Sequence, residues 1–175
     1  MELSNGTILA TILVEHLFYI VLMIVLLGCS AFFSGSETAF FHLSQRTVRQ
    51  FAQSGKKMER LTALTLATPS PFLTALLFGH LLVNVLYFAI TSMMSFQFGR
   101  STGPVAGTLV AVSGFVLLLL FGEMLPKSLA YTNARQFCLC AAPVCYLFLK
   151  ILSPLLCIID VLIVQPAIRL FVGPP

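Results

Sequence analysis

The chain has 175 residues, of which 58% are hydrophobic and 9% are charged, and its formal net charge is +4. Soluble domains carry roughly 25% charged residues, so the composition excludes an ordinary soluble protein and predicts an all-α membrane protein with one transmembrane domain over residues 1–175. No nucleic-acid-binding signature is present, and the five scattered cysteines do not predict a disulfide framework.

The first apolar run predicts a membrane span over about residues 8–33, which is long enough to cross a ~30 Å hydrocarbon core. Ser34-Gly35-Ser36-Glu37 follows it. We interpret Gly35 as the place where the first helix stops and a new helix starts. Ser34 and Glu37 have the spacing of a capping box for the new helix. Breaks at membrane depth are tolerated where they line a polar cavity, so we expect Ser34 to face one.

Residues 42–70 predict a basic connector of two short helices, separated at Ser54-Gly55. Thr68-Pro69-Ser70-Pro71 then predicts a helix start, with Ser70 as N-cap and Pro71 as the first helical residue. The basic residues of the connector are Arg46, Arg49, Lys56, Lys57 and Arg60.

Two further spans are predicted over about residues 72–94 and 104–125, joined by a loop that holds Gly99, Arg100 and Gly103. The apolar stretch 137–172 contains three prolines, which break or kink helices, and it fits a fourth crossing or a bent hairpin at the interface. The positive-inside rule places the amino end outside and the basic connector in the cytoplasm.

The second predicted span carries Gly79, His80 and Asn84, and positions 80 and 84 lie one helical turn apart on the same face. Interhelical hydrogen bonds would explain both polar side chains. The amide oxygen of Asn84 also suits a hard cation. Because hard cations prefer oxygen to imidazole, we favour hydrogen bonding for His80.

Near its carboxyl end the third predicted span carries Gly122 and Glu123, and Glu123 follows nineteen uncharged residues. Pro126 lacks the N–H that would bond the carbonyl of Gly122, so this segment offers a carboxylate and a freed carbonyl. The alternative is an interfacial Glu123 paired with Lys127 at the i, i+4 spacing.

A hydroxyl, an amide oxygen, a carboxylate and backbone carbonyls form an all-oxygen set with one negative charge. Mg²⁺ or Na⁺ fits such a set, whereas Zn²⁺ and Cu⁺ would call for histidine or thiolate. Ca²⁺ usually takes more carboxylate oxygens than one glutamate supplies.

Three motifs carry a resemblance: Phe33-Ser34-Gly35-Ser36-Glu37-Thr38-Ala39-Phe40, Gly79-x-x-x-Val83-Asn84 and Gly122-Glu123-x-x-Pro126-Lys127. Over nearly the whole chain, the sequence resembles the transmembrane domain of the CorC/CNNM family of magnesium transporters. The resemblance implies a homodimer in the cell membrane, with three spans per subunit and a cytoplasmic belt of juxtamembrane helices. It favours a Pro-kinked interfacial hairpin over residues 137–172. Independently of the resemblance, no nucleophile, base and orienting group occur together at plausible membrane depth, so we expect no enzymatic activity.

The resemblance also implies an intramembrane Mg²⁺ site and export coupled to Na⁺ entry. It assigns Mg²⁺ ligands to Ser34, Gly79, Asn84 and Glu123, and the carbonyl freed by Pro126 adds Gly122. From the residues themselves we expect hinges or helix breaks at Gly35 and Pro126, and positions flanking the ligands at Ser36, Glu37, His80 and Lys127. The family often has asparagine where this chain has His80.

Family members continue into cytoplasmic CBS modules that sense nucleotide, and none occurs here, so we expect a truncated fragment without nucleotide binding. An alternative function is a non-transporting membrane scaffold or Mg²⁺ sensor, in which the same polar residues hold helices together.

Overall fold

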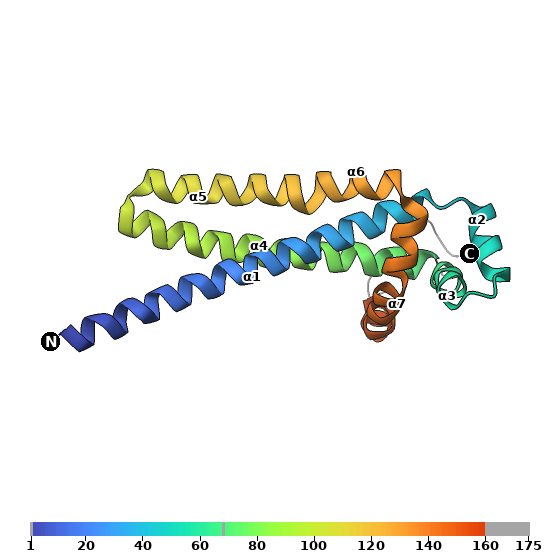
Figure 1. Cartoon of the computed structure of the whole chain (residues 1–175), viewed down its shortest axis with the longest axis horizontal. Coiled ribbons are helices and arrows are strands. Elements are labelled where there is room, and N and C mark those ends of the chain that lie inside the picture. Colours follow the sequence, from blue (N-terminus) through green and yellow to red (C-terminus); the bar gives the residue numbers. More distant parts are fainter. Residues whose placement is uncertain (1, 68, 160–175) are drawn as a thin grey trace, which may run out of the picture. The chain divides into compact units, whose positions relative to one another are not determined.

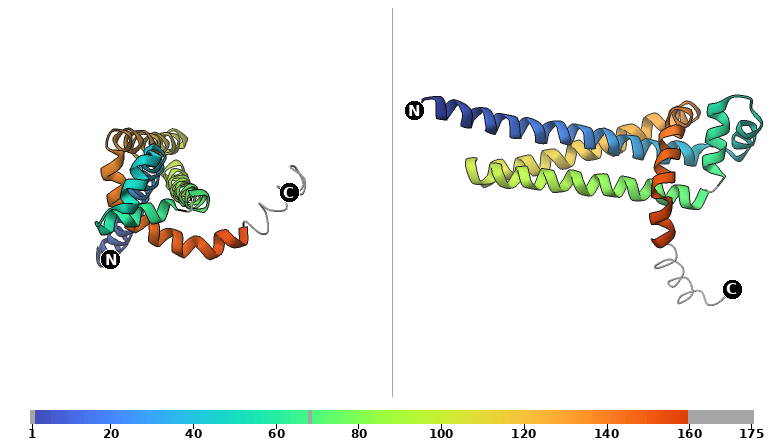
Figure 2. Two further views of the ribbon diagram at one scale, coloured as in Figure 1. Left: turned by 90° about the vertical axis from the view of Figure 1, so that its right-hand side faces the viewer. Right: turned by 90° about the horizontal axis from the view of Figure 1, so that it is seen from below.

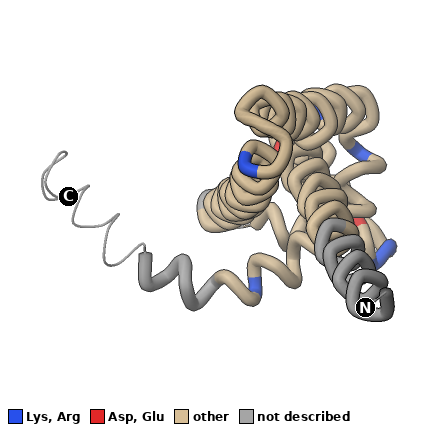
Figure 3. Tube along the Cα trace, turned by 90° about the vertical axis from the view of Figure 1, so that its left-hand side faces the viewer, with Lys and Arg blue, Asp and Glu red and all other residues tan. Residues whose placement is uncertain are grey.

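The structure, a computed structural model, describes the backbone of residues 2–67 and 69–159 and the side chains of residues 17–67 and 71–152. These residues are helical apart from short connections, with no strand among them, and charged residues are sparse along the helices (Figures 1 and 3). In chain order the elements are α1 (Glu2–His42), α2 (Gln45–Gln53), α3 (Lys57–Leu66), α4 (Pro69–Thr102), α5 (Pro104–Leu117), the π-helical segment η1 (Leu118–Met124), α6 (Leu125–Thr132) and α7 (Ala134–Ile159).

Four helical stretches are long and apolar enough to cross a membrane, judged by length and composition: Leu17–His42, Pro71–Thr102, Pro104–Thr132 and Ala134–Leu152. The first three overlap the predicted spans 8–33, 72–94 and 104–125 but extend beyond each of them at the carboxyl end. The fourth also qualifies, so the three-span topology with an interfacial belt stays a prediction.

The described residues fall into two compact units. The first unit lies within Met1–Ser34 and His80–Ser128, and the second lies within Gly35–Gly79 and Leu129–Pro175.

In the first unit, α4 and α5 run side by side in opposite directions (Figure 1). The backbones approach closely where Gly107 faces Gly99, and a Cβ on Gly107 would lie 3.0 Å from the Gly99 Cα. Hydroxyl groups bridge the same seam, since Ser95 Oγ donates to the Gly107 carbonyl at 2.7 Å and Tyr87 Oη donates to the Gly114 carbonyl at 3.2 Å. Small residues and hydroxyls are the usual means by which helices associate in lipid.

The predicted loop between the second and third spans is shorter than expected. Gly99 and Arg100 continue α4, and Gly103 alone makes the turn with a φ of 113°, a value that favours glycine. Pro104 then occupies the first turn of α5, where its missing N–H costs nothing.

The predicted helix break at Gly35 is wrong, because α1 is one helix of 41 residues. Ser34 and Glu37 lie inside it, so they form no capping box. In the second unit, a Cβ on Gly35 would lie 2.7 Å from Phe137 Cζ. Gly35 allows this aromatic ring to pack closely against α1 and does not interrupt the helix.

The connector prediction is confirmed at its centre, since α2 and α3 are separated at Ser54–Lys56. Ser44 caps α2 by accepting a hydrogen bond from the Thr47 N–H at 3.3 Å. The next helix, α4, begins at Pro69, so the prediction of Ser70 as N-cap and Pro71 as the first helical residue is wrong. Proline is favoured at either first-turn position because it donates no N–H.

The second unit also contains α7, which packs against α3. The helix continues through Pro143 but changes direction along its length (Figure 2), as expected when proline removes an intrahelical hydrogen bond. The rest of the predicted hairpin, beyond residue 159, lies outside the described residues.

An ion pair joins α3 to α7 in the second unit. Arg135 donates to Glu59 Oε1 at 3.4 Å, and its guanidinium lies 5.3 Å from the ring centre of the buried Phe51. Hydrogen bonding from Ser54, with the positive charges of Lys56 and Arg135, holds the pKa of Glu59 below its ordinary value, although burial acts in the opposite direction.

We therefore expect acid to weaken the second unit. A carboxyl whose pKa is lower in the folded state stabilises the fold above its unfolded pKa, near 4.5, and this stabilisation is lost as the pH falls through the folded value. The temperature at which half of the wild-type protein is unfolded should decrease when the pH is lowered below about 4.5. Glu59→Gln should lack this component, and identical pH profiles for both proteins would contradict the prediction.

Candidate cation site

Three helical segments of the first unit bring oxygen-bearing side chains together. Asn84 of α4 donates from Nδ2 to Glu123 Oε1 of η1 at 3.1 Å, and Ser34 of α1 donates to the Glu123 carbonyl at 3.4 Å. His80 Nε2 lies 3.8 Å from Glu123 Oε1. The structure thus gathers the hydroxyl, amide and carboxylate that the sequence analysis singled out on separate spans.

Ser30 is a member of this cluster that the sequence analysis missed. Its hydroxyl donates to Asn84 Oδ1 at 2.7 Å, and the side chain is fully buried. Ser30 and Ser34 are one turn apart on α1, the same spacing as His80 and Asn84 on α4. The one-turn spacing of Ser30 and Ser34 is the signal in the sequence that could have indicated Ser30.

The site segment of the third span has an unusual backbone. Leu118–Met124 is π-helical, and at its end the Leu125 N–H donates to the Leu120 carbonyl, five residues back. Pro126 cannot donate to the Gly122 carbonyl, and its ring crowds that group in an α-helix, so a wider turn relieves the conflict. Such π-helical turns are rare and occur frequently at functional sites.

Gly122 permits the close approach of η1 to α1. A Cβ at this position would lie 3.0 Å from Ser30 Oγ and 2.9 Å from Leu118 Cδ1. The carbonyl that Ser34 reaches belongs to Glu123, one residue beyond the carbonyl predicted to be free. Gly122 therefore provides space for close packing, a role that differs from the free carbonyl predicted for it from Pro126.

The remaining predicted positions lie along continuous helices. Gly79 directly precedes His80 within α4, and Pro126 is buried at the start of α6. Ser36 and Glu37 belong to the second unit, where Ser36 is buried beside the Cys145 thiol. Among the described residues, Lys127 makes no ion pair with Glu123, so the interfacial pair considered as an alternative is not formed.

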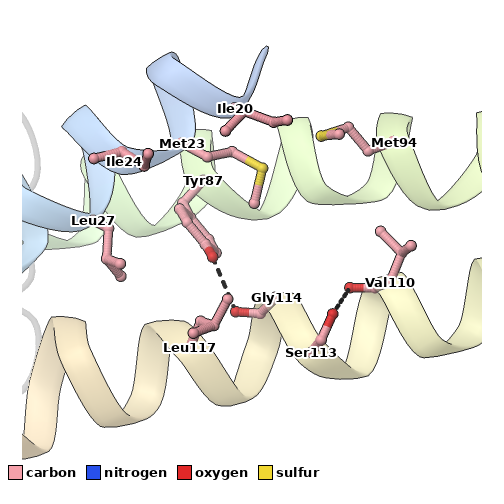
Figure 4. Close-up of a pocket in the computed structure, with 10 residues that line it drawn as sticks. All are labelled: Ile20, Met23, Ile24, Leu27, Tyr87, Met94, Val110, Ser113, Gly114 and Leu117. Atoms are coloured by element: carbon pink, nitrogen blue, oxygen red, sulfur yellow. Dashed lines mark hydrogen bonds between the residues drawn. The ribbon is translucent and has the colours of Figure 1, made fainter. Parts of the chain in front are cut away.

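A separate cavity of about 260 Å³ in the first unit is lined by apolar side chains of α1, α4 and α5 (Figure 4). Tyr87 and Ser113 supply its hydroxyl groups, and both donate to backbone carbonyls. An apolar wall with its few polar groups already bonded cannot replace the water shell of an ion, so this cavity is not a candidate cation site.

Within the described part of the chain, no group of three or more His, Cys, Asp or Glu side chains comes together. A cation at this site would rely on one carboxylate plus neutral oxygens. The side chain of His80 is 11% exposed and that of Glu123 is 31% exposed, so the carboxylate is only partly buried.

Comparison with known proteins shows a match to one protein family. Residues 21–171 match the family model described as "Cyclin M transmembrane N-terminal domain". The chain is 28% identical over 141 residues to a UPF0053 protein of Haemophilus influenzae, and the matched region covers 81% of this chain and 33% of that protein. It is 33% identical over 101 residues to the "UPF0053 inner membrane protein YfjD" of Escherichia coli, covering 58% of this chain and 23% of that protein.

A UPF0053 protein of Synechocystis is 30% identical over 160 residues, covering 83% of this chain and 34% of that protein. The chain thus spans about a quarter to a third of the length of these relatives. The name of the Escherichia coli protein, which calls it an inner membrane protein, agrees with the several membrane-length helices seen here.

Proposed function

Because this chain belongs to the Cyclin M transmembrane domain family, we propose that it is the membrane domain of a magnesium transporter that exports Mg²⁺ in exchange for Na⁺. The domain works as a homodimer in the cell membrane, with its amino end outside. The observation that supports the proposal most is the convergence of Ser34, Asn84 and Glu123 from three helical segments.

Mg²⁺ is the substrate of this site. Glu123 supplies the negative charge, Ser34 and Asn84 supply neutral oxygens, and backbone carbonyls at Gly79 and Gly122 complete the proposed set. Hard oxygen ligands match the preference of Mg²⁺, which gives up its waters reluctantly. Several helices must therefore hold the ligands in place before the ion enters.

Asn84 has to reorient for this role, since its Nδ2 donor faces Glu123 in the ion-free arrangement. Turning the amide by half a rotation brings Oδ1 toward Glu123 and Nδ2 toward Ser30. The Ser30 hydroxyl now donates to Asn84 Oδ1, but a hydroxyl can equally accept. The same hydrogen-bonded partner can thus support both orientations of the amide.

A second candidate function also has a specific observation behind it. The polar groups of the site already bond one another across α1, α4 and η1, and such bonds hold membrane helices together. In a non-transporting scaffold, this network would be purely structural, Mg²⁺ flux would be nil, and loss of the Glu123 charge would leave function intact. In a sensor, Mg²⁺ would bind without being transported.

Purified protein should gain thermal stability with Mg²⁺. Ligand that binds only the folded state stabilises it by about 2.7 kcal/mol at a hundred times the dissociation constant. The unfolding midpoint should rise with Mg²⁺ and return with a chelator, while Mg²⁺-loaded liposomes containing the protein should release Mg²⁺ when external Na⁺ is present. No stabilisation at millimolar Mg²⁺ would contradict the cation site, and stabilisation without flux would favour the sensor.

A further inference from the structure

The helical hairpin formed by α2 and α3, residues 45–66, is densely cationic. All five of its basic side chains are exposed, and none makes an ion pair with another described residue. They are Arg46, Arg49, Lys56, Lys57 and Arg60. On α2, the cations share one face at the i, i+3 spacing, while Phe51 is buried on the other.

The only carboxylate of the hairpin does not offset this charge at the surface. Glu59 is 8% exposed and points to Arg135 of α7, which it contacts at 3.4 Å. Arg135, a cation from outside the hairpin, pairs with Glu59, so this one carboxylate offsets only a small part of the positive charge that the five exposed cations present.

The chain connections keep the hairpin next to the membrane. The candidate span Leu17–His42 ends three residues before α2 begins, and the candidate span that starts at Pro71 begins five residues after α3 ends. A residue reaches at most ~3.6 Å, so the hairpin ends lie within roughly 10–18 Å of the span ends. This upper bound is about one to two Debye lengths at physiological ionic strength, so the hairpin ends stay within reach of the electrostatic field of the membrane surface.

Apolar side chains accompany the cations. Met58 is 53% exposed and Leu64 is 57% exposed on α3. A cavity of about 390 Å³ in the second unit is lined by both polar and apolar surface, including Leu43, Val48 and Leu66. A helical surface that combines exposed cations with apolar groups is typical of segments that lie in the membrane interface.

We propose that the α2–α3 hairpin is a binding surface for anionic phospholipid. The cations contact lipid phosphates, Met58 and Leu64 enter the upper acyl region, and the cavity accepts the glycerol part of a lipid. Near an anionic membrane surface, each Lys or Arg contributes roughly fivefold to binding. Positive charge that served orientation alone would not select one lipid over another. This inference does not depend on the magnesium proposal.

Fluorescence quenching tests the lipid selectivity directly. The chain contains no tryptophan, so Leu64→Trp gives a single reporter on the hairpin. The full chain would be placed in phosphatidylcholine vesicles that contain a minor fraction of either brominated phosphatidylglycerol or brominated phosphatidylcholine. We expect at least about twofold stronger quenching by the anionic lipid. Met58→Trp is the second reporter, in case the first variant does not fold.

Three controls separate charge from other causes. Replacing all five cations with glutamine should bring the quenching ratio to one, whereas lysine at the three arginine positions should preserve it. Arg100→Gln, which removes one charge from the first unit, should leave the ratio unchanged. Added inorganic phosphate should not compete, because the surface binds lipid and not free phosphate.

Equal quenching by the two lipids, with tryptophan accessible to both, would overturn the inference. The readout needs no Mg²⁺, so this failure would be distinct from failure of the cation site.

Discussion

Replacing Glu123 with glutamine will abolish the Mg²⁺-dependent rise in thermal stability and the Mg²⁺ flux, and it will leave the Mg²⁺-free protein nearly as stable as before. Glutamine keeps an oxygen that can accept the hydrogen bond from Asn84 Nδ2, now at 3.1 Å. It removes the single negative charge of the site. At an effective dielectric constant near 20, attraction between a carboxylate and a divalent ion is several kcal/mol, so affinity should fall at least about a hundredfold.

The matched control is Glu59→Gln, the same chemical change at a carboxylate that pairs with Arg135. At neutral pH this variant should retain both the Mg²⁺ response and the flux. If Glu123→Gln responds to Mg²⁺ as the wild type does, the carboxylate is not a ligand and the scaffold function gains support. Isothermal titration of both variants with Mg²⁺ would measure the difference in affinity.

The second large effect concerns the seam between α4 and α5. Gly107→Val should destabilise the protein by about 1–3 kcal/mol, the usual cost of overpacking a tight contact. A Cβ at Gly107 would lie 2.7 Å from the Ser95 carbonyl oxygen, which is backbone and cannot rotate away. The helices must separate, which also weakens the 2.7 Å hydrogen bond from Ser95 Oγ to the Gly107 carbonyl.

Thermal unfolding in detergent would measure this cost, which corresponds to a fall of several degrees in the midpoint for a chain of this size. Gly28→Val is the matched control, because Gly28 is exposed and a Cβ there meets nothing within 4 Å. A similar fall for both variants would mean that valine in a helix, and not the helix seam, causes the loss. No fall at Gly107 would contradict the close packing.

Several features depend on local sequence and were predicted well. Composition fixes the membrane setting, and in lipid the backbone must bond internally, which makes the long apolar runs helical. Ser54 and Gly55 interrupt the connector as predicted, because local hydrogen bonding and backbone freedom decide where short helices end. Pro104 begins a helix for an equally local reason.

Other features depend on partners distant in the chain. The local sequence around Gly35 suggests a helix break. In the structure Gly35 instead provides space for the ring of Phe137, a residue about a hundred positions later in the sequence. Ser30 joins the site because it meets Asn84, 54 residues away. No local pattern specifies such a meeting.

The sequence by itself determined that this protein is helical and apolar, and which polar groups it carries into the apolar helices, because solvent preference and backbone bonding act residue by residue. Only the tertiary structure decided that Ser34, Asn84 and Glu123 lie together, and that the backbone around Glu123 is π-helical. Both follow from side-chain packing between separate helices and from the crowding at Pro126, which depend on three-dimensional fit.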